Sequence, residues 1–318
     1  MDQAQSFAKP LHTAPFSKPP ETATMYPSIH RVTHFLACIA LACTATATTL
    51  AVAAAPVFPP DSTMAKIQKR GDITIGVHYD VPLFDQKNPL TGKLQGYEID
   101  IANQLGRDLF GSDGHVKFIE APGPVREQFI LQHKADLILA TYTITAARLK
   151  TVAFAGPIYE AKQAIVVKTD NKAFGKTIPD FAALNDHSVC VVSGSISNVL
   201  LLKVAPKAKI MALGNNPDCA KAVRQGRVEA FATDDALLIG FVNETPKEIR
   251  FVDNAGGDEQ PYGVGVNKDS LDLCRWVNER LLDMSKDGFL DKSFGATVGT
   301  VIKRKPEPLK ATDMKYCE

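Results

Sequence analysis

Short apolar strand patterns alternate with amphipathic helical patterns along most of this chain. The first series has strand patterns at residues 73–77, 116–120 and 137–143, with helical patterns at residues 97–109 and 125–133. Apolar residues recur at helical spacing in the helical segments and run almost continuously in the strand segments. Strands that alternate with helices predict a parallel sheet with helices on its faces.

A second series of the same kind follows. Its strand patterns at residues 188–192, 209–213 and 230–233 are separated by a helical pattern that ends at Lys203 and another at residues 219–225. The repetition predicts a second α/β unit rather than an extension of the first.

The two series predict an α/β protein with two lobes. Lobe 1 takes residues 56–165 and 251–318, and lobe 2 takes the inserted residues 166–250. The chain would then cross twice between the lobes, which allows them to close like a hinge around a ligand in the cleft between them. The flanking patterns that complete the lobes are strands at residues 163–168, 250–252 and 262–266 and a long amphipathic helix at residues 271–286.

A threonine-rich segment follows one strand of the first series directly. The apolar run at residues 137–140 leads into Thr141 and Thr143, and Arg148 comes soon after. The carboxyl end of a strand is where an α/β fold presents its ligand groups, and a guanidinium group offers paired donors that fit a carboxylate. On this segment alone, a polar strand cap with a surface arginine explains the pattern equally well.

Composition excludes some classes of partner. The 318 residues include 36 Lys and Arg and 35 Asp and Glu, for a net charge of +1, without any block of basic residues. Such a balance disfavours nucleic acid as a partner. No phosphate loop, nucleophile elbow or metal cluster stands out in the sequence, so we expect neither a cofactor nor a metal.

The first 55 residues are predicted to be a leader and an export signal rather than part of the fold. Residues 1–24 lack periodicity and are expected to be disordered or untranslated, which makes Met25 a candidate start. Arg31 then precedes an apolar run at residues 35–55. Cleavage near Ala54, lipid attachment at Cys43 and an uncleaved anchor remain open alternatives.

Four cysteines lie beyond the signal. An even number in an exported protein predicts disulfides, with three possible pairings, and four buried thiols are the alternative. Their spacing is not that of a zinc site. They are Cys190, Cys219, Cys274 and Cys317.

Several segments resemble one known family in their order and spacing. The glycine–aromatic start of the helix at residues 96–102, the segment 141–148, the strand 230–234 that ends in aspartate, the strand 262–266 and Gly288 are similar to those of solute-binding proteins that deliver polar amino acids to ABC importers. Within this family, the Val-Cys strand and the Thr-Asp-Asp turn resemble the glutamate-binding proteins.

The resemblance implies a periplasmic-binding-protein fold with no enzymatic activity. It implies an exported monomer, periplasmic or at the cell surface and possibly lipid-anchored, that works with a membrane permease and an ATPase. The implied ligand is glutamate, then aspartate, glutamine or asparagine. A cyclohexadienyl or arogenate dehydratase on the same scaffold is one alternative. A ligand-sensing module is another, which we disfavour because the sequence continues into no membrane segment or signalling domain.

The resemblance also implies roles for particular residues. Arg148 would bind the α-carboxylate of the ligand with help from Thr143, and Asp234 in the other lobe would bind its α-ammonium. Ser195 and the amides of residues 194–197, at a helix start, would complete the carboxylate cradle. Ile196 departs from the family pattern, where threonine is common. A purely structural role for Asp234 as a helix N-cap is the alternative.

Side-chain specificity is expected from the loop after the first strand. His78 stands where many relatives have an acidic residue, which argues against a basic ligand; a surface histidine is the alternative. Tyr79 would line the pocket or pack in the core. The same resemblance favours disulfides Cys190–Cys219, within lobe 2, and Cys274–Cys317, which would fasten the C-terminal tail.

Overall fold

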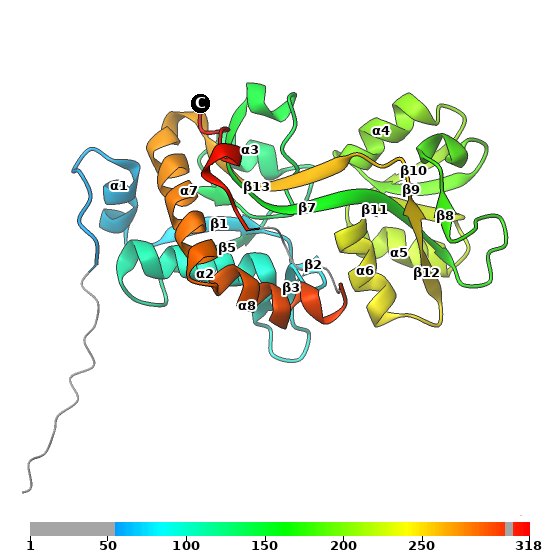
Figure 1. Cartoon of the computed structure of the whole chain (residues 1–318), viewed down its shortest axis with the longest axis horizontal. Helices are drawn as coiled ribbons and strands as arrows, with labels where there is room; N and C mark the ends of the chain where they lie inside the picture. The colour runs from blue at the N-terminus through cyan, green and yellow to red at the C-terminus, as the bar shows by residue number, and fades with distance from the viewer. Residues whose placement is uncertain (1–54, 303–307) are drawn as a thin grey trace, which may run out of the picture. The chain divides into compact units, whose positions relative to one another are not determined.

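The computed structural model describes residues 55–302 and 308–318. The expected leader and export signal therefore lie almost wholly outside the described residues. Within the described part, the chain folds around one large mixed sheet and a small three-stranded sheet (Figure 1).

The large sheet has ten strands in the order β10-β9-β11-β7-β13-β6-β1-β5, with β12 paired to β7 and to β8. Pairing is parallel among β5, β1 and β6 and among β10, β9 and β11, whereas β7 and β13 pair antiparallel with their neighbours. The strands are β1 Ile73–Val77, β5 Val116–Glu120, β6 Leu137–Ile138, β7 Val152–Lys168, β8 Thr177–Ile178, β9 Ser188–Val192, β10 Lys209–Leu213, β11 Ala230–Asp234, β12 Ile249–Asn254 and β13 Glu259–Asn267.

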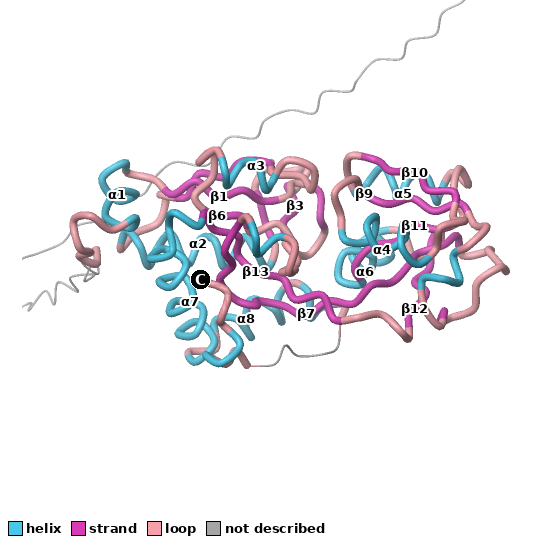
Figure 2. Tube along the Cα trace, turned by 90° about the horizontal axis from the view of Figure 1, so that it is seen from above, coloured by secondary structure: helices cyan, strands magenta, loops and turns pink. Residues whose placement is uncertain are grey.

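Two long strands join the halves of the molecule. β7 runs for 17 residues and pairs with β13 from Val152 to Lys162, and beyond that with β11 and β12 (Figures 1 and 2). The sheet is therefore mixed rather than parallel as predicted, because the chain reverses direction on crossing between its halves. The predicted separate strand at residues 163–168 is only the far end of β7.

The strand predicted at residues 137–143 was too long. β6 ends at Ile138, and Thr141 has a left-handed φ of 45° that breaks the extended chain. Thr143 returns to the sheet only through an isolated bridge to Tyr262. The threonine-rich segment is therefore a turn above the sheet rather than the end of a strand.

The packing divides into two lobes, which we define by their buried clusters. Lobe 1 is the part around β5, β1 and β6, and its core draws on residues 64–161 and 262–317 together with Ala236 and Leu237. Lobe 2 is the part around β9, β10 and β11, and its core draws on residues 164–252. The expected boundaries after residues 165 and 250 fall inside β7 and β12, since the strands run on through the crossing.

The helices cover the faces of each lobe. In lobe 1, Ser62 caps α1 (Thr63–Arg70) and Gly71 ends it in a left-handed conformation. The small sheet β2-β3-β4 lies between β1 and α2 in the chain. The helices and remaining strands are α1 Thr63–Arg70, β2 Asp80–Val81, β3 Asp85–Lys87, β4 Leu94–Gln95, α2 Tyr97–Phe110, α3 Arg126–Leu131, α4 Ile196–Val204, α5 Asn216–Arg224, α6 Asp235–Glu244, α7 Leu271–Lys286 and α8 Phe289–Ala296, with short 3₁₀ helices at Arg148–Lys150, Phe181–Leu184, Lys268–Ser270, Val298–Thr300 and Ala311–Asp313.

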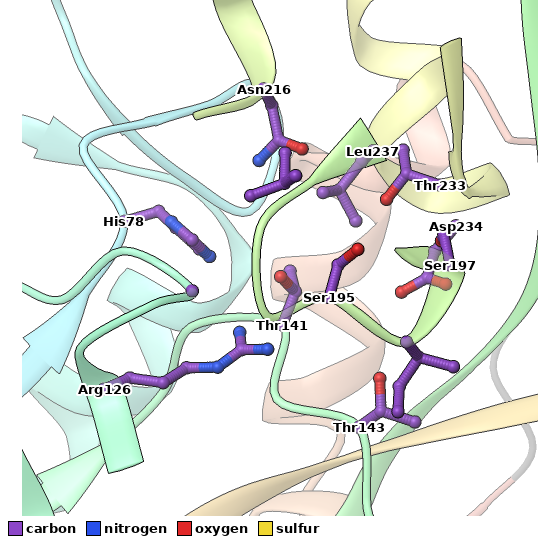
Figure 3. A pocket seen from close by; sticks show the side chains of 13 residues that line it. His78, Arg126, Thr141, Thr143, Ser195, Ser197, Asn216, Thr233, Asp234 and Leu237 are labelled. Carbon is purple, nitrogen blue, oxygen red and sulfur yellow. The ribbon is translucent and has the colours of Figure 1, made fainter. Parts of the chain in front are cut away.

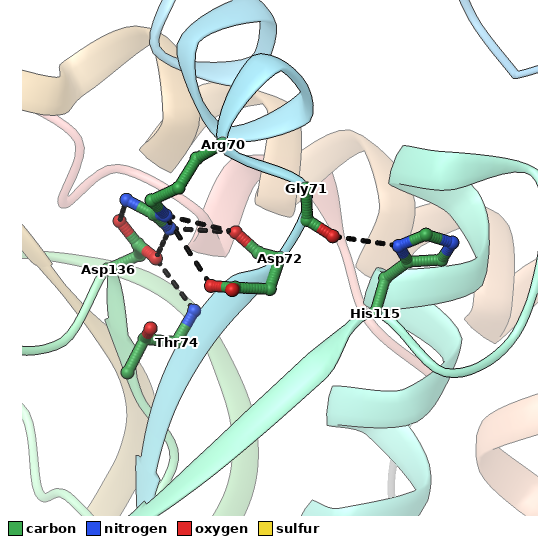
Figure 4. Close-up of polar contacts among 6 residues, drawn as sticks. All are labelled: Arg70, Gly71, Asp72, Thr74, His115 and Asp136. Atoms are coloured by element: carbon green, nitrogen blue, oxygen red, sulfur yellow. Dashed lines mark hydrogen bonds and ion pairs between the residues drawn. The ribbon is translucent and has the colours of Figure 1, made fainter.

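A polar cluster fastens the amino ends of the lobe 1 strands (Figure 4). The Arg70 guanidinium pairs with the Asp136 carboxylate, which also accepts the backbone N–H of Thr74 at 2.7 Å. The His115 ring contacts the carbonyl of Gly71 at 2.8 Å. These contacts hold the C-terminal end of α1 against the starts of β1 and β5. They lie at the end of these strands that is opposite the pocket, where the carboxyl ends of β1 and β6 are.

Both predicted disulfides are present. Cys190 on β9 bonds Cys219 on α5, with a sequence separation of 29, and Cys274 on α7 bonds Cys317, with a separation of 43. The first ties a strand to a helix inside lobe 2. The second fastens the C-terminal segment against lobe 1.

We expect each disulfide to stabilise its lobe by restricting the unfolded chain. Loops of these lengths correspond to about 3.5–4 kcal/mol in the loop-closure estimate. Replacing Cys274 and Cys317 by alanine should lower the free energy of unfolding by about that amount, measured by guanidinium denaturation without reductant. The Cys190→Ala/Cys219→Ala pair is the matched comparison, and a loss below about 1 kcal/mol for both would contradict the account.

Candidate ligand-binding site

One pocket is lined by residues of both lobes (Figure 3). Most of its walls come from the carboxyl ends of strands and the turns that follow them, which is where α/β sheets present ligand groups. Lobe 1 contributes His78, Gly123, Arg126, Thr141 and Thr143, and lobe 2 contributes Val192, Ser195, Ile196, Ser197, Asn216, Thr233 and Asp234. Leu237 on α6, which packs into the lobe 1 core, also lines the pocket.

Asp234 ends β11 and is only 7% exposed. Its Oδ2 accepts the hydroxyl of Tyr262 at 2.7 Å, and its Oδ1 accepts the side-chain amide of Gln163. Gln163 Oε1 in turn accepts the hydroxyl of Ser197 at 2.5 Å. The network fixes the Asp234 carboxylate as an acceptor that opens toward the pocket.

The alternative role of Asp234 as a helix cap is not what the side chain does. Asp234 occupies the N-cap position of α6, but its carboxylate makes no capping hydrogen bond. Asp235 accepts the backbone N–H groups of Ala236 and Lys162 instead, at 2.7 and 3.0 Å. Asp235 therefore accepts the local backbone N–H groups, whereas the Asp234 carboxylate lines the pocket.

Burial raises the pKa of Asp234 to about 7. The Tyr262 hydrogen bond lowers this pKa, neighbouring Asp235 raises it, and the positive charges of Arg126 and Arg148 lower it again. A cation placed against this carboxylate would favour its ionised form. The position thus suits an ammonium group.

Two arginines flank one tyrosine ring on the lobe 1 side. The guanidinium carbons of Arg126 and Arg148 lie 4.4 and 4.7 Å from the centre of the Tyr142 ring. Arg126 donates to the carbonyl of Ala140 at 2.6 Å, and Arg148 to that of Thr143 at 2.7 Å. Neither guanidinium forms an ion pair with a carboxylate of the described residues.

These guanidiniums are held in an unfavourable setting. Burial and the charge of Arg126 lower the pKa of Arg148 to about 10, and burial lowers the pKa of Arg126 as well. Two cations close together and removed from water need anions to offset them. The pair is therefore a candidate receptor for carboxylates.

Arg126 was not predicted from the sequence, although it lines the pocket and Arg148 does not. Arg148 is half-buried beside the pocket, and its Nη2 reaches the carbonyl of Gly194 in lobe 2 at 3.4 Å. The only sequence signal for Arg126 is its place after strand β5 and the Pro-Gly-Pro turn at residues 122–124.

The loop after β1 places its two candidate residues differently. His78 lines the pocket, is 5% exposed, and has a pKa lowered to about 3 by burial and by the charge of Arg126, so its ring is neutral. Tyr79 is not among the lining residues; its hydroxyl donates to the carbonyl of Phe118 at 3.3 Å and its ring packs against the lobe 1 core.

The start of α4 forms the opposite wall. Ser195 is the N-cap of this helix, and its Oγ accepts the backbone N–H of Asn198 at 3.2 Å. Ile196 begins the helix and lines the pocket beside it. The first amide groups of α4 thus face the pocket at the positive end of the helix dipole. Gly194 precedes them with a left-handed φ of 73°.

In the described part of the chain, no group of three or more His, Cys, Asp or Glu residues is arranged to hold a metal ion. Taken together, the site offers one anion from lobe 2 and two cations from lobe 1, which is the pattern that a zwitterion with an extra carboxylate requires.

Residues 73–295 match the bacterial extracellular solute-binding proteins, family 3. The chain belongs to this family. It is 34% identical over 214 residues to the glutamine-binding protein of Geobacillus stearothermophilus, covering 67% of this chain and 79% of that one. It is 29% identical over 266 residues to the glutamate-binding protein GluB of Corynebacterium efficiens, covering 80% and 88%.

Solved structures agree with the sequence comparison. The solute receptor for L-cysteine of Neisseria gonorrhoeae has a TM-score of 0.71 to this protein at 33% identity, covering 78% of this chain and 99% of that one. The family confirms the predicted fold, and these relatives are binding proteins rather than enzymes. The protein is an amino-acid-binding component of the ABC importer type.

The Asp234 network generates a testable prediction. Tyr262→Phe removes a hydroxyl that stabilises the ionised carboxylate, so the pKa of Asp234 should rise above its value of about 7. The measurement is a pH titration of the Asp234 carboxyl carbon by NMR. Tyr79→Phe, which removes a hydroxyl outside the pocket, is the control. An unchanged titration in Tyr262→Phe would show that the hydrogen bond does not act on this carboxylate.

Proposed function

We propose that this solute-binding protein carries a polar L-amino acid to a membrane permease, and that its preferred ligand is glutamate, followed by aspartate, glutamine and asparagine. The observation that carries the proposal is a pair of guanidiniums on the lobe 1 side, Arg126 in the pocket wall and Arg148 beside the pocket. Neither has a carboxylate partner among the described residues, and Asp234 lines the pocket from lobe 2.

In the proposed mode of binding, each charged group of the ligand meets a group of opposite charge. Arg148 and the first amides of α4 receive the α-carboxylate, and Asp234 receives the α-ammonium. Arg126 receives the side-chain carboxylate, with the neutral ring of His78 beside it. Hydrogen bonds to charged groups contribute about 1.5–3 kcal/mol each. Thr141 and Thr143 complete the lobe 1 wall.

The two-lobed arrangement supports a closing motion. A zwitterion that contacts Arg148 and Asp234 touches both lobes at once, so it can satisfy both contacts only when the lobes are together. The lobes are joined by β7 and β13, and two connections of this kind permit rotation about a hinge. The permease and its ATPase would then recognise the closed form.

The names of the relatives leave the side chain of the ligand open, since they include a glutamine-binding protein and a receptor for L-cysteine. Arg126 favours an acidic ligand over a neutral one. A glutamine amide would leave this buried guanidinium without a counter-charge, which costs free energy that glutamate would not lose.

Export to the periplasm or the cell surface follows from the family as part of the same proposal. No helix among the described residues is both long and apolar enough to cross a bilayer. The Cys43 lipid anchor and the cleavage near Ala54 fall on residues outside the described part, and both stay predictions.

The class of ligand is tested by thermal unfolding of the refolded protein, residues 55–318, with each of the twenty L-amino acids and with glucose. A ligand that binds only the folded state raises the midpoint, and the rise grows with the logarithm of the ligand concentration relative to its Kd. A shift with one or a few polar amino acids supports the proposal. No shift with any of them, in a protein that unfolds cooperatively, would contradict it.

Arg126→Gln should weaken glutamate and aspartate selectively. Loss of one charged hydrogen bond of about 1.5–3 kcal/mol corresponds to roughly 10- to 150-fold in Kd, whereas glutamine should lose less than about threefold. Calorimetric titration with both ligands measures the difference. Arg275→Ala, at an exposed position on α7, is the charge-matched control. Equal losses for glutamate and glutamine would remove Arg126 from the specificity argument.

Binding should release protons near neutral pH. Because the pKa of Asp234 is about 7 without ligand and an ammonium partner lowers it, about half a proton should leave the protein per ligand at pH 7. Titration calorimetry in buffers of different ionisation enthalpy measures this number. The release should vanish near pH 9, where Asp234 is already ionised. Proton uptake at pH 7 would contradict the assignment of Asp234.

A further inference from the structure

Two acidic side chains lie fully buried beneath the pocket and outside the charges assigned to the ligand. Asp85 on β3 and Glu98 on α2 are both 0% exposed. The two carboxyl groups lie close enough for each to change the pKa of the other. Two carboxylates removed from water at this range cannot both stay ionised without strong repulsion.

The loop geometry forces this contact. The backbone N–H groups of Tyr97 and Glu98 donate to the carbonyls of Leu83 and Phe84 at 2.9 and 3.0 Å, which clamps the turn before β3 onto the start of α2. Gly96 makes the approach possible, because a Cβ there would lie 2.2 Å from the Phe84 carbonyl oxygen. Asp85 follows Phe84 and is thereby carried against Glu98.

Each carboxyl group also holds a backbone segment that lines the pocket. Both oxygens of Glu98 accept the N–H of Thr141, at 3.0 and 2.9 Å. Asp85 Oδ2 accepts the N–H of His78 at 2.6 Å. Thr141 is the residue with a left-handed φ of 45°, a conformation that a threonine adopts only when its surroundings hold it there.

An oxygen of Asp85 that has no hydrogen-bond partner indicates where the shared proton lies. Asp85 Oδ1 is buried and finds no hydrogen-bond donor among the described residues. This oxygen gains a partner if it carries the proton and donates it to the Glu98 carboxylate. Glu98 then stays ionised and accepts the Thr141 N–H as a charged group. We infer that Asp85 and Glu98 share a single proton, and that this acid pair positions the Thr141 and His78 segments for ligand binding.

The charges around the pair favour this distribution. Burial raises the pKa of Glu98 to about 7, and the positive charge of Arg126 on α3 opposes this rise and favours the ionised form. Burial and the charge of Glu98 raise the pKa of Asp85 further above its usual value, and the charge of Asp80 at the start of β2 adds to this rise. His78 is neutral and supplies no cation. Burial and the charge of Glu98 raise the pKa of the Tyr97 hydroxyl on α2, so this group is neutral as well. The inference rests on the proposed function, since it gives the pair a role in binding.

The proton itself can be observed. At pH 8.5 the infrared spectrum should retain the carbonyl band of one protonated carboxylic acid, because Asp234 and Asp80, with pKa values of about 7 and 6, are then ionised. The band should disappear in Asp85→Asn and persist in Asp113→Asn, a change at an exposed acid. Absence of the band from the wild type would overturn the inference.

The pH dependence of folding gives a second test. A carboxyl group whose pKa is raised in the folded state contributes stability below its ordinary pKa, and this stability is lost as the pH rises above that value. Asp85→Asn keeps a donor toward Glu98 and an acceptor for His78, but it has no proton to lose. The wild type should therefore lose stability relative to Asp85→Asn as the pH rises. The equilibrium folding constant of Asp85→Asn divided by that of the wild type should increase by up to about tenfold per pH unit between pH 5 and 7.5. A ratio independent of pH would contradict proton sharing.

Binding tests the positioning role. Asp85→Asn should bind the preferred ligand within about threefold of the wild type, since the contacts are reproduced. Glu98→Gln should weaken binding about tenfold, because the Thr141 N–H then meets a neutral amide in place of a charged acceptor. If Glu98→Gln binds as the wild type does, or Asp85→Asn loses binding while folded, the positioning role is wrong. Failure of the wild type to bind any amino acid would instead refute the proposed function, and the infrared and folding tests would still decide the pair.

Discussion

The pairing of β7 with β13 is the constraint on which the rest of the structure depends. These strands run side by side through the boundary between the lobes, so main-chain hydrogen bonds fix the two halves to one another. The same strands carry Gln163 and Tyr262, which hold the Asp234 carboxylate. The crossing thus does two things at once: it connects the lobes, and it orients the one anionic group that lobe 2 presents to the pocket.

The pocket illustrates how burial makes charges dependent on a ligand. Asp234 is desolvated and satisfied only by neutral donors, and the two guanidiniums beside Tyr142 are desolvated and satisfied only by carbonyl groups. Each group would gain free energy from an opposite charge that no other described residue supplies. This is why the charges, rather than the shape of the pocket, carry the functional argument.

Much of the fold could be predicted because its signals are local. The strands at residues 73–77, 188–192 and 209–213 end where the apolar runs end, and Ser62 and Gly71 bound α1 through ordinary capping. The continuity of β7 could not be predicted, since Gly156 and Pro157 usually interrupt a strand. Its pairing partner is about one hundred residues away, and that partner decides the outcome.

The sequence allowed the prediction of those pocket residues that lie within a recognisable motif, and of no others. His78, Thr141, Thr143, Ser195, Ile196 and Asp234 come together around the pocket, whereas Tyr79 turns to the core. Arg126 was missed because a single arginine after a turn has no local mark of burial. Its place at the pocket depends on α3 packing beneath Tyr142.

The central claim is tested most directly by the ratio of the Kd values for L-glutamine and L-glutamate, measured calorimetrically on the refolded protein. The account predicts glutamate to bind at least about tenfold more tightly, and equal or tighter binding of glutamine would contradict it.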